Sequence, residues 1–144
     1  MTLTFRMVRG LDGYLQIRNE WMQVLNRIER PEFFHQYAWY GALLEAWPAV
    51  AAEMFFIIAY RGDVAIAVCP LQLTQSRMHG MRLRTLAPPD PNDVAYPDFI
   101  CDRADYGELF PALIDHLRSQ RDISWDVLTL PRIFASDATA HTLA

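Results

Sequence analysis

The chain contains no lysine, because all 13 of its basic residues are arginines. Without an ε-amino group it can form no Schiff base with pyridoxal phosphate and can supply no phosphate-loop lysine, so both enzyme classes are excluded for this chain alone. The arginines are scattered rather than gathered in a stripe, and the formal net charge is −4. We therefore expect no nucleic-acid partner.

Cysteine is nearly absent too, and long apolar runs are lacking. Cys69 and Cys101 are too few and too far apart for a disulfide framework or a Cys-x-x-Cys metal site. No apolar run approaches the ~20 residues of a membrane-spanning helix, and the N-terminus does not resemble a signal peptide. These absences predict a cytoplasmic protein without a membrane span. No metal is expected either, since none of the four histidines has a metal-ligand partner at i+3 or i+4, namely His35, His79, His116 and His141.

What the chain does contain fits one folded domain over residues 1–144. A hydrophobic content of 52% and a charged content of 21% are ordinary for a globular protein of this size. Hydrophobic periodicity predicts helices and flanking strands at Leu3–Val8 (strand), Leu11–Ile28 (helix), Tyr37–Trp47 (helix), Tyr106–Ser119 (helix) and Ser124–Leu130 (strand).

Several polar and proline residues refine these helices. Pro48 should end the second helix, and Pro111 argues that the regular part of the third begins between Gly107 and Phe110. Asp105 and Glu108 are spaced like a capping box. His35 precedes the second helix, where it suits a helix-entry role, and His116 lies late in the third helix, where a cation suits the helix dipole.

The most informative stretch runs from Glu53 to Leu86 and predicts a three-stranded meander. Its strands are expected at Met54–Tyr60, Val64–Thr74 and Met81–Leu86, joined by turns that contain Gly62 and Gly80. A proline-rich irregular loop follows at residues 87–93, and a short edge strand is expected within Tyr96–Cys101. A last helix starts at Ser136-Asp137, and the chain stops barely two turns later at Ala144.

This order of elements, strand, two helices, meander, helix and strand, is similar to the acetyltransferase fold of the GNAT superfamily. Details resemble the N-terminal half of bacterial double-GNAT proteins, the CelD-like acetyltransferases that are related to Fem-type aminoacyl transferases. The segments that carry this resemblance are Trp21–Leu25 (Trp-x-x-Val-Leu), Phe34–Trp39, Val64–Leu71 with its final Pro-Leu, the loop from Asn92-Asp93 to Asp98-Phe99, and the Trp-Asp-x-Leu strand of Trp125–Leu130.

The resemblance implies an α+β, layered fold with a mixed, mostly antiparallel central sheet and flanking helices. It also implies a chain truncated in the helix that starts near residue 136, whose missing C-terminal GNAT-like half normally binds acyl-coenzyme A. A naturally short, degenerate homologue is the alternative. Natural partners would be that second half or a second copy of the chain, and a small-molecule acceptor.

The donor site of the superfamily is a Gln/Arg-x-x-Gly-x-Gly/Ala loop between the fourth strand and the third helix, where backbone N–H groups approach the pyrophosphate. The corresponding interval here, Leu86–Asp105, contains no glycine. Arg77–Arg82 matches the first four motif positions, but it lies between two strands and ends in a bulky arginine. We interpret it as a hairpin turn and expect no cofactor to be bound by this chain.

Two sets of candidate residues remain. Asp93, Tyr96 and Asp98 could line an acceptor groove, where a carboxylate and a phenol would position an amine or hydroxyl; loop capping and packing are the simpler alternatives. Trp39, Tyr40 and Trp47 crowd one short helix, and whatever they leave uncovered would be an apolar interface.

The sequence thus predicts the acceptor-side half of a GNAT-like acyltransferase, inactive by itself, that contributes to moving an acyl group from acyl-coenzyme A or a similar donor to an amine or hydroxyl. It identifies no catalytic residue. A non-catalytic GNAT-like binding or interaction module is the alternative, and an unrelated enzyme that reuses the fold is a third possibility.

Overall fold

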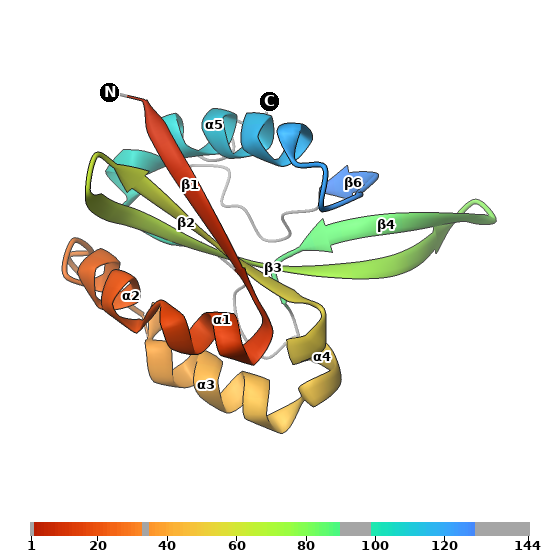
Figure 1. The fold of residues 1–144 in the computed structure, drawn as a ribbon, viewed down its shortest axis with the longest axis horizontal. Helices are drawn as coiled ribbons and strands as arrows, with labels where there is room; N and C mark the ends of the chain where they lie inside the picture. The colour runs from red at the N-terminus through yellow and green to blue at the C-terminus, as the bar shows by residue number, and fades with distance from the viewer. Residues whose placement is uncertain (1, 33–34, 90–98, 129–144) are drawn as a thin grey trace.

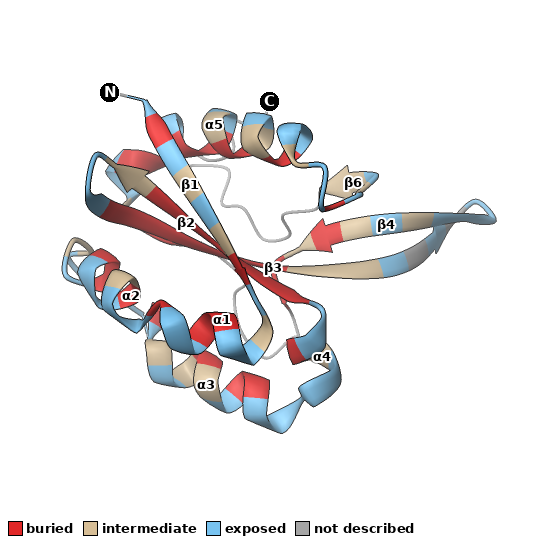
Figure 2. Ribbon diagram, viewed as in Figure 1, coloured by how far each residue is buried: buried red, intermediate tan, exposed pale blue. Residues whose placement is uncertain are grey.

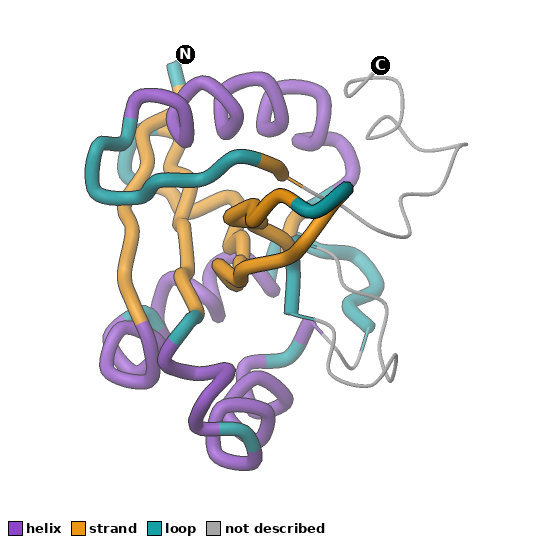
Figure 3. Tube along the Cα trace, turned by 90° about the vertical axis from the view of Figure 1, so that its right-hand side faces the viewer, coloured by secondary structure: helices purple, strands orange, loops and turns teal. Residues whose placement is uncertain are grey.

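One β-sheet lies between two layers of helices in the computed structural model, which describes residues 2–32, 35–89 and 99–128 (Figures 1 and 3). The strands are β1 (Leu3–Arg9), β2 (Met54–Arg61), β3 (Val64–Met78), β4 (Met81–Ala87), β5 (Ile100–Cys101) and β6 (Val127–Leu128). The helices are α1 (Gly10–Gln16), α2 (Arg18–Leu25), α3 (Tyr37–Ala46), α4 (Pro48–Ala52) and α5 (Tyr106–Ser119), the last preceded by a 3₁₀ turn, η3 (Arg103–Asp105).

The sheet is mixed and mostly antiparallel, in the order β1-β2-β3-β4-β6, with β5 also paired to β3. Among the strands of the described residues, only β6 runs parallel to its neighbour, β4, at Thr85–Leu86. The meander predicted between Glu53 and Leu86 is confirmed, because β2, β3 and β4 pair in sequence through two tight turns. Gly62 and Gly80 have positive φ in these turns, as the hairpin geometry requires.

Burial on both faces explains why β2 shows no alternation of polar and apolar residues. Phe55, Ile57 and Ala59 pack on the α5 side, whereas Met54, Phe56 and Ile58 pack on the side of the other helices. A strand covered on both faces reads as a continuous apolar run. Figure 2 shows the resulting buried band through the middle of the sheet.

The two helical layers cover opposite faces of this sheet (Figure 3). Helices α1 to α4 bring Trp21, Tyr40 and Leu44 onto the Phe56 face. Helix α5 covers the other face with Phe110 and its apolar neighbours. The predicted fold class, a layered α+β structure with flanking helices, is therefore confirmed.

Two stacked tyrosines, Tyr14 and Tyr37, connect α1 to α3. The rings of Tyr14 and Tyr37 stack at a centroid distance of 4.1 Å. Each hydroxyl donates a hydrogen bond to the main-chain carbonyl of the other residue. Burial raises the pKa of Tyr14 and also that of Tyr37, so both rings are neutral at neutral pH. A Cβ at Gly41 would lie 2.7 Å from the Tyr14 hydroxyl oxygen, so glycine permits this close approach.

The first predicted helix is divided into two, and a short additional helix follows the second. The single helix predicted over Leu11–Ile28 is wrong: Ile17, with φ −109° and ψ 19°, separates α1 from α2. This break lets the two helices follow the sheet separately, and Ile17 itself is fully buried. Pro48 ends α3 as predicted but also opens α4, because a proline suits the first helical position.

Helix α5 begins at Tyr106, so the later start inferred from Pro111 is wrong. A proline at this position removes the N–H that would bind the carbonyl of Gly107. Both Gly107 and Pro111 are exposed, so water can bind that carbonyl instead.

The remaining boundaries differ in the strands. β3 runs to Met78, beyond the predicted Thr74. The strand expected within Tyr96–Cys101 is Ile100–Cys101 in the described part of the chain, and the one expected at Ser124–Leu130 is Val127–Leu128 there. The helix expected near residue 136 lies outside the described residues.

Replacing Gly41 by alanine tests the packing of the stacked Tyr14–Tyr37 pair. The added Cβ must displace the Tyr14 hydroxyl, and a buried, stacked ring with two hydrogen bonds has little freedom to move. We expect Gly41→Ala to lower the free energy of unfolding by about 1–3 kcal/mol, measured by urea denaturation.

Gly107→Ala is the matched control. It adds the same methyl group to an exposed helical site where nothing lies within 4 Å, so it should raise stability by about 0.4–1 kcal/mol. Equal effects of the two substitutions would contradict the packing assigned to Gly41.

Candidate functional site

The place where the GNAT resemblance puts a donor site is the passage from β4 to α5. Here the chain leaves the sheet and returns to it. β4 ends opposite Gln72 of β3, and β5 resumes pairing opposite Val68. Three residues, opposite Cys69–Leu71, would be enough to continue the ladder between these two pairs. The chain has twelve residues there instead, 88–99.

Prolines account for this interruption. Leu73 donates its N–H toward the β2 side of β3, to the carbonyl of Glu53. Because backbone direction alternates along a strand, the nitrogen of Pro70 points to the opposite side, where β4 would continue, and it carries no hydrogen. Pro88 and Pro89 directly after β4 likewise cannot donate to a ladder.

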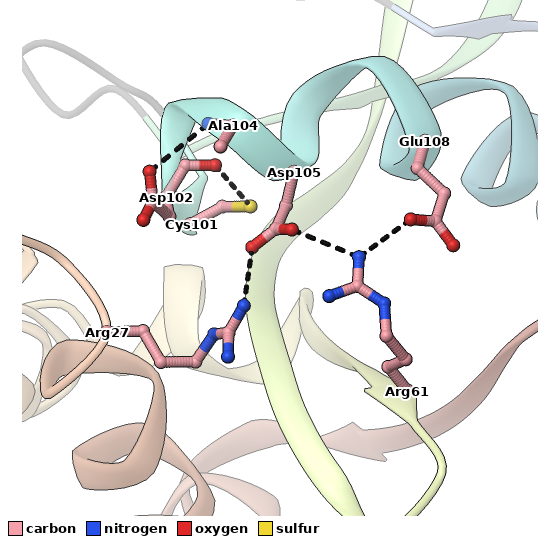
Figure 4. Close-up of polar contacts among 7 residues, drawn as sticks. All are labelled: Arg27, Arg61, Cys101, Asp102, Ala104, Asp105 and Glu108. Atoms are coloured by element: carbon pink, nitrogen blue, oxygen red, sulfur yellow. Dashed lines mark hydrogen bonds and ion pairs between the residues drawn. The ribbon is translucent and has the colours of Figure 1, made fainter. Parts of the chain in front are cut away.

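At the end of this passage, four charged side chains meet around the start of α5 (Figure 4). Arg27, two residues past α2, binds one oxygen of the Asp105 carboxylate at 3.0 Å. Arg61, at the end of β2, binds its other oxygen at 3.0 Å and also Glu108 at 2.6 Å. We call these four residues the Asp105 cluster. They draw together the α2 layer, the sheet and α5.

Asp105 is only 6% exposed, and both of its oxygens are engaged by guanidinium groups. The predicted capping box of Asp105 and Glu108 is therefore wrong, since the Asp105 side chain makes no cap hydrogen bond to α5. Asp102 instead accepts the Ala104 N–H at the start of the 3₁₀ turn. Glu108, and then Asp105, raise the pKa of Arg61, which keeps this guanidinium charged.

The electrostatic result is a helix start occupied by carboxylates. Asp102, Asp105 and Glu108 lie within its first turns, and the two nearby arginines already bind two of them. A phosphate would have to displace a carboxylate from each guanidinium and would meet negative charge at a helix end that otherwise attracts anions. The arrangement thus places both guanidinium groups in ion pairs with carboxylates of this helix start.

Across the sheet, an arginine and an aspartate join β4 to the segment before β6. Arg84 donates its main-chain N–H to Asp126 at 2.8 Å, and its guanidinium binds both oxygens of that carboxylate. The Asp126 N–H in turn donates to the Arg84 carbonyl. The guanidinium of Arg84 lowers the pKa of Asp126. These bonds set the register of the parallel pair.

The predicted acceptor residues Asp93, Tyr96 and Asp98 lie outside the described residues. The three predicted interface aromatics, Trp39, Tyr40 and Trp47, differ in how far they are buried. Tyr40 is buried among Trp21 and Phe56, so its ring belongs to the core. Trp39 is half-buried and packs its edge against Tyr40, whereas Trp47 is 41% exposed between α3 and α4.

Two histidines have structural roles. His35 is buried at the entry to α3, where its Nδ1 accepts the Glu32 N–H at 3.0 Å, in agreement with the predicted helix-entry role. His116 stacks on Phe5 at a centroid distance of 4.7 Å. Burial lowers the pKa of both imidazoles, so the expectation of a cation at His116 is wrong.

Within residues 2–32, 35–89 and 99–128, no group of three or more His, Cys, Asp or Glu side chains is arranged to hold a metal ion. None of the helices described there is both long enough and apolar enough to span a membrane. Sequence reasoning missed the Asp105 cluster. Its only local signal was the spacing of Asp105 and Glu108, because Arg27 and Arg61 come from distant segments.

Neither a protein-family model nor a curated protein sequence matches this chain. Solved structures do match its fold. A ribosomal-protein-alanine N-acetyltransferase from Brucella melitensis biovar Abortus aligns with a TM-score of 0.53 and 15% identity, over 94% of this chain and 85% of that one. A GNAT family acetyltransferase from Staphylococcus aureus gives 0.53 and 10%, over 94% and 90%.

A third match is an aminoglycoside acetyltransferase from an uncultured soil metagenomic sample, solved with trehalose, at a TM-score of 0.52 and 6% identity. It covers 98% of this chain and 84% of that one. At such low identities the likeness concerns the fold alone. The chain therefore has the fold of GNAT acetyltransferases and spans most of the length of each of these three.

Removing the Asp105 carboxylate tests the cluster. Asp105→Ala leaves Arg27 and Arg61 without the group that neutralises both, in a part-buried place. We expect a loss of about 1–3 kcal/mol in the free energy of unfolding by chemical denaturation. Glu108→Gln, at the exposed rim of the same cluster, should cost no more than about 1 kcal/mol. The opposite ranking would contradict the central position given to Asp105.

Burial of His35 and partial burial of His116 predict a pH dependence of stability. Their pKa values are lowered in the folded state, so the unfolded chain takes up protons first as the pH falls. Stability should therefore be complete above about pH 6.5 and decline below it. His116→Phe keeps the stack on Phe5 but removes the titrating group, so its unfolding free energy should fall less between neutral and mildly acidic pH. An unchanged slope in this variant would contradict the assignment for His116.

Proposed function

We propose that this chain acts in acyl transfer, as the acceptor-side unit of a GNAT-like acyltransferase, and that the acyl donor is held outside it. A second GNAT-like unit, or a second copy of the chain, would supply that donor site. The complete enzyme would move an acyl group from acyl-coenzyme A or a similar thioester to an amine or hydroxyl.

The fold supports the first part of this proposal. Three acetyltransferases share it over most of the chain, and two of them are named for an amine-bearing class of acceptor, a ribosomal-protein alanine and an aminoglycoside. Because fold does not fix function, the likeness favours acyl transfer without naming a substrate.

One observation carries the second part, which is the carboxylate-lined start of α5. A diphosphate needs small residues that let backbone N–H groups approach it, together with positive potential at the helix end. This chain has no glycine between Leu86 and Asp105, and it places Asp105 and Glu108 at that helix start with Arg61 bound to both.

The acceptor would bind beyond β4, where Asp93, Tyr96 and Asp98 remain predicted groove residues. A carboxylate there would attract an amine, and the phenol of Tyr96 would position it. Trp47, with the rim of Trp39, is the surface that we assign to the second unit, since exposed aromatic side chains are frequent in interfaces.

Calorimetric titration with acetyl-coenzyme A tests the missing donor site. We expect no saturable heat up to about 1 mM ligand, because the sequence from Leu86 to Asp105 has no glycine to let backbone N–H groups approach a diphosphate. A dissociation constant in the micromolar range would overturn the claim. A known acetyl-coenzyme A-binding protein titrated in the same buffer is the positive control.

A separate titration tests the acceptor role. Two-dimensional NMR with an alanine-terminated peptide and an aminoglycoside should give saturable shifts that Asp93→Asn or Asp98→Asn weakens. If no amine binds and no acyl transfer occurs with any second unit, the alternative of a non-catalytic binding module is favoured. That alternative is compatible with the same carboxylate-lined helix start.

A further inference from the structure

The hairpin of β3 and β4 continues beyond the rest of the sheet. β2 pairs with β3 only as far as Gln72, and β6 pairs with β4 only at Thr85–Leu86. Residues 74–83 extend past both neighbours as a two-stranded ribbon, which projects from the body in Figure 1 and is largely exposed in Figure 2. We call these residues the ribbon. Met81, at its tip, is 64% exposed.

The ribbon carries positive charge on an acidic chain. The sequence contains no Asp or Glu between Asp63 and Asp90, while the ribbon holds Arg77 and Arg82. These two arginines are directly opposite each other across the strands. Within the described parts of the chain, no ion pair involves either of them.

Backbone alternation shows which groups the ribbon offers to its surroundings. On β3, Leu73 donates its N–H away from β4, and on β4, Arg84 donates its N–H away from β3. Every second residue repeats these directions, so the main-chain N–H and C=O groups of Arg77 and Arg82 also point outward. Each outer edge of the ribbon thus presents main-chain groups of an arginine.

The same alternation makes Arg77 and Arg82 a pair without mutual main-chain hydrogen bonds. Such pairs have the closer Cα atoms, about 4.5 Å apart, so their two like charges face each other at the shortest cross-strand spacing. Like charges in this position lower stability, and a two-stranded ribbon is marginally stable by itself. A negatively charged occupant would relieve both costs.

We propose that the ribbon binds an extended, acidic segment of a partner protein by strand addition at one of its edges. Main-chain groups of Arg77 or Arg82 would bind the added strand, and its carboxylates would lie beside the arginine side chains. The arginines repel basic strands and select acidic ones. This inference is independent of acyl transfer, since it uses no residue of the passage from β4 to α5.

Fluorescence anisotropy with labelled peptides tests the proposal. The probe is a short peptide of alternating Glu and Thr, which favours an extended strand. One comparison peptide is the Glu-Thr sequence with every main-chain nitrogen methylated, which keeps the charge but removes the N–H donors of both strand edges; another alternates Lys with Thr. We expect saturable binding of the Glu-Thr peptide that weakens with salt, and at least about fivefold weaker binding of both comparison peptides.

Arg77→Glu gives the sharpest variant. It turns the facing like charges into an ion pair, so we expect it to raise the thermal unfolding midpoint while weakening binding of the Glu-Thr peptide by about fivefold or more. Gain of stability with loss of binding is not expected of a merely structural arginine. Arg118→Gln, which removes an exposed arginine of α5 remote from the ribbon, is the control and should change neither.

Several outcomes would overturn the proposal. Equal binding of the Glu-Thr peptide and its N-methylated form would exclude strand addition. Failure of the Glu-Thr peptide to bind at millimolar concentration would exclude an acidic strand. Tighter binding of single-stranded RNA or of anionic lipid vesicles in the same assay would assign the ribbon to a different class of partner. Self-association that Arg77→Glu abolishes, without peptide binding, would make a second copy the occupant.

Discussion

The buried carboxylate of Asp105 joins the separate parts of this fold at one point. It binds Arg27 from the end of the α2 layer and Arg61 from the end of β2, and it lies itself at the start of α5. This shared charged group at the end of the sheet therefore links the helical layers of its two faces. The same interaction sets the chemistry of that end, because it places negative side chains where a helix start would otherwise attract an anion.

The start of α5 is therefore the point at which the fold bears on the proposed function. This chain shares its fold with three acetyltransferases. Our proposal concerns whether the passage from β4 into α5 can hold an acyl donor. Here the passage leaves the sheet at prolines, returns as two residues of β5, and enters α5 through Asp102 and Asp105. The chain thus has the fold of GNAT acetyltransferases and carries paired charges at the start of α5. The projecting ribbon of residues 74–83 adds a second, separate surface at the opposite end of β3.

Much of the fold could be predicted from the sequence, because its determinants are local. Gly62 and Gly80 mark the two turns of the meander, and the apolar run of β2 reflects a sheet covered on both faces. What escaped prediction depends on residues far apart in the chain. The spacing of Asp105 and Glu108 indicated a capping box, but arginines 78 and 44 positions away from Asp105 bind its carboxylate instead. Similarly, His116 stacks on Phe5 from a distant strand, and its burial there lowers its pKa, whereas the dipole of its own helix alone would favour a cation. Of the candidate site residues, only Trp39, Tyr40 and Trp47 lie in described segments, and Tyr40 belongs to the core.

The central claim is that the start of α5 does not receive a diphosphate, and an NMR titration with inorganic pyrophosphate measures this directly. The main-chain amides from Arg103 to Glu108 report any anion that binds at that helix start. The account predicts that these amides keep their chemical shifts as pyrophosphate is added, apart from the small, linear changes caused by ionic strength. Saturable shifts centred on these amides, with release of Arg61 from Asp105, would contradict it.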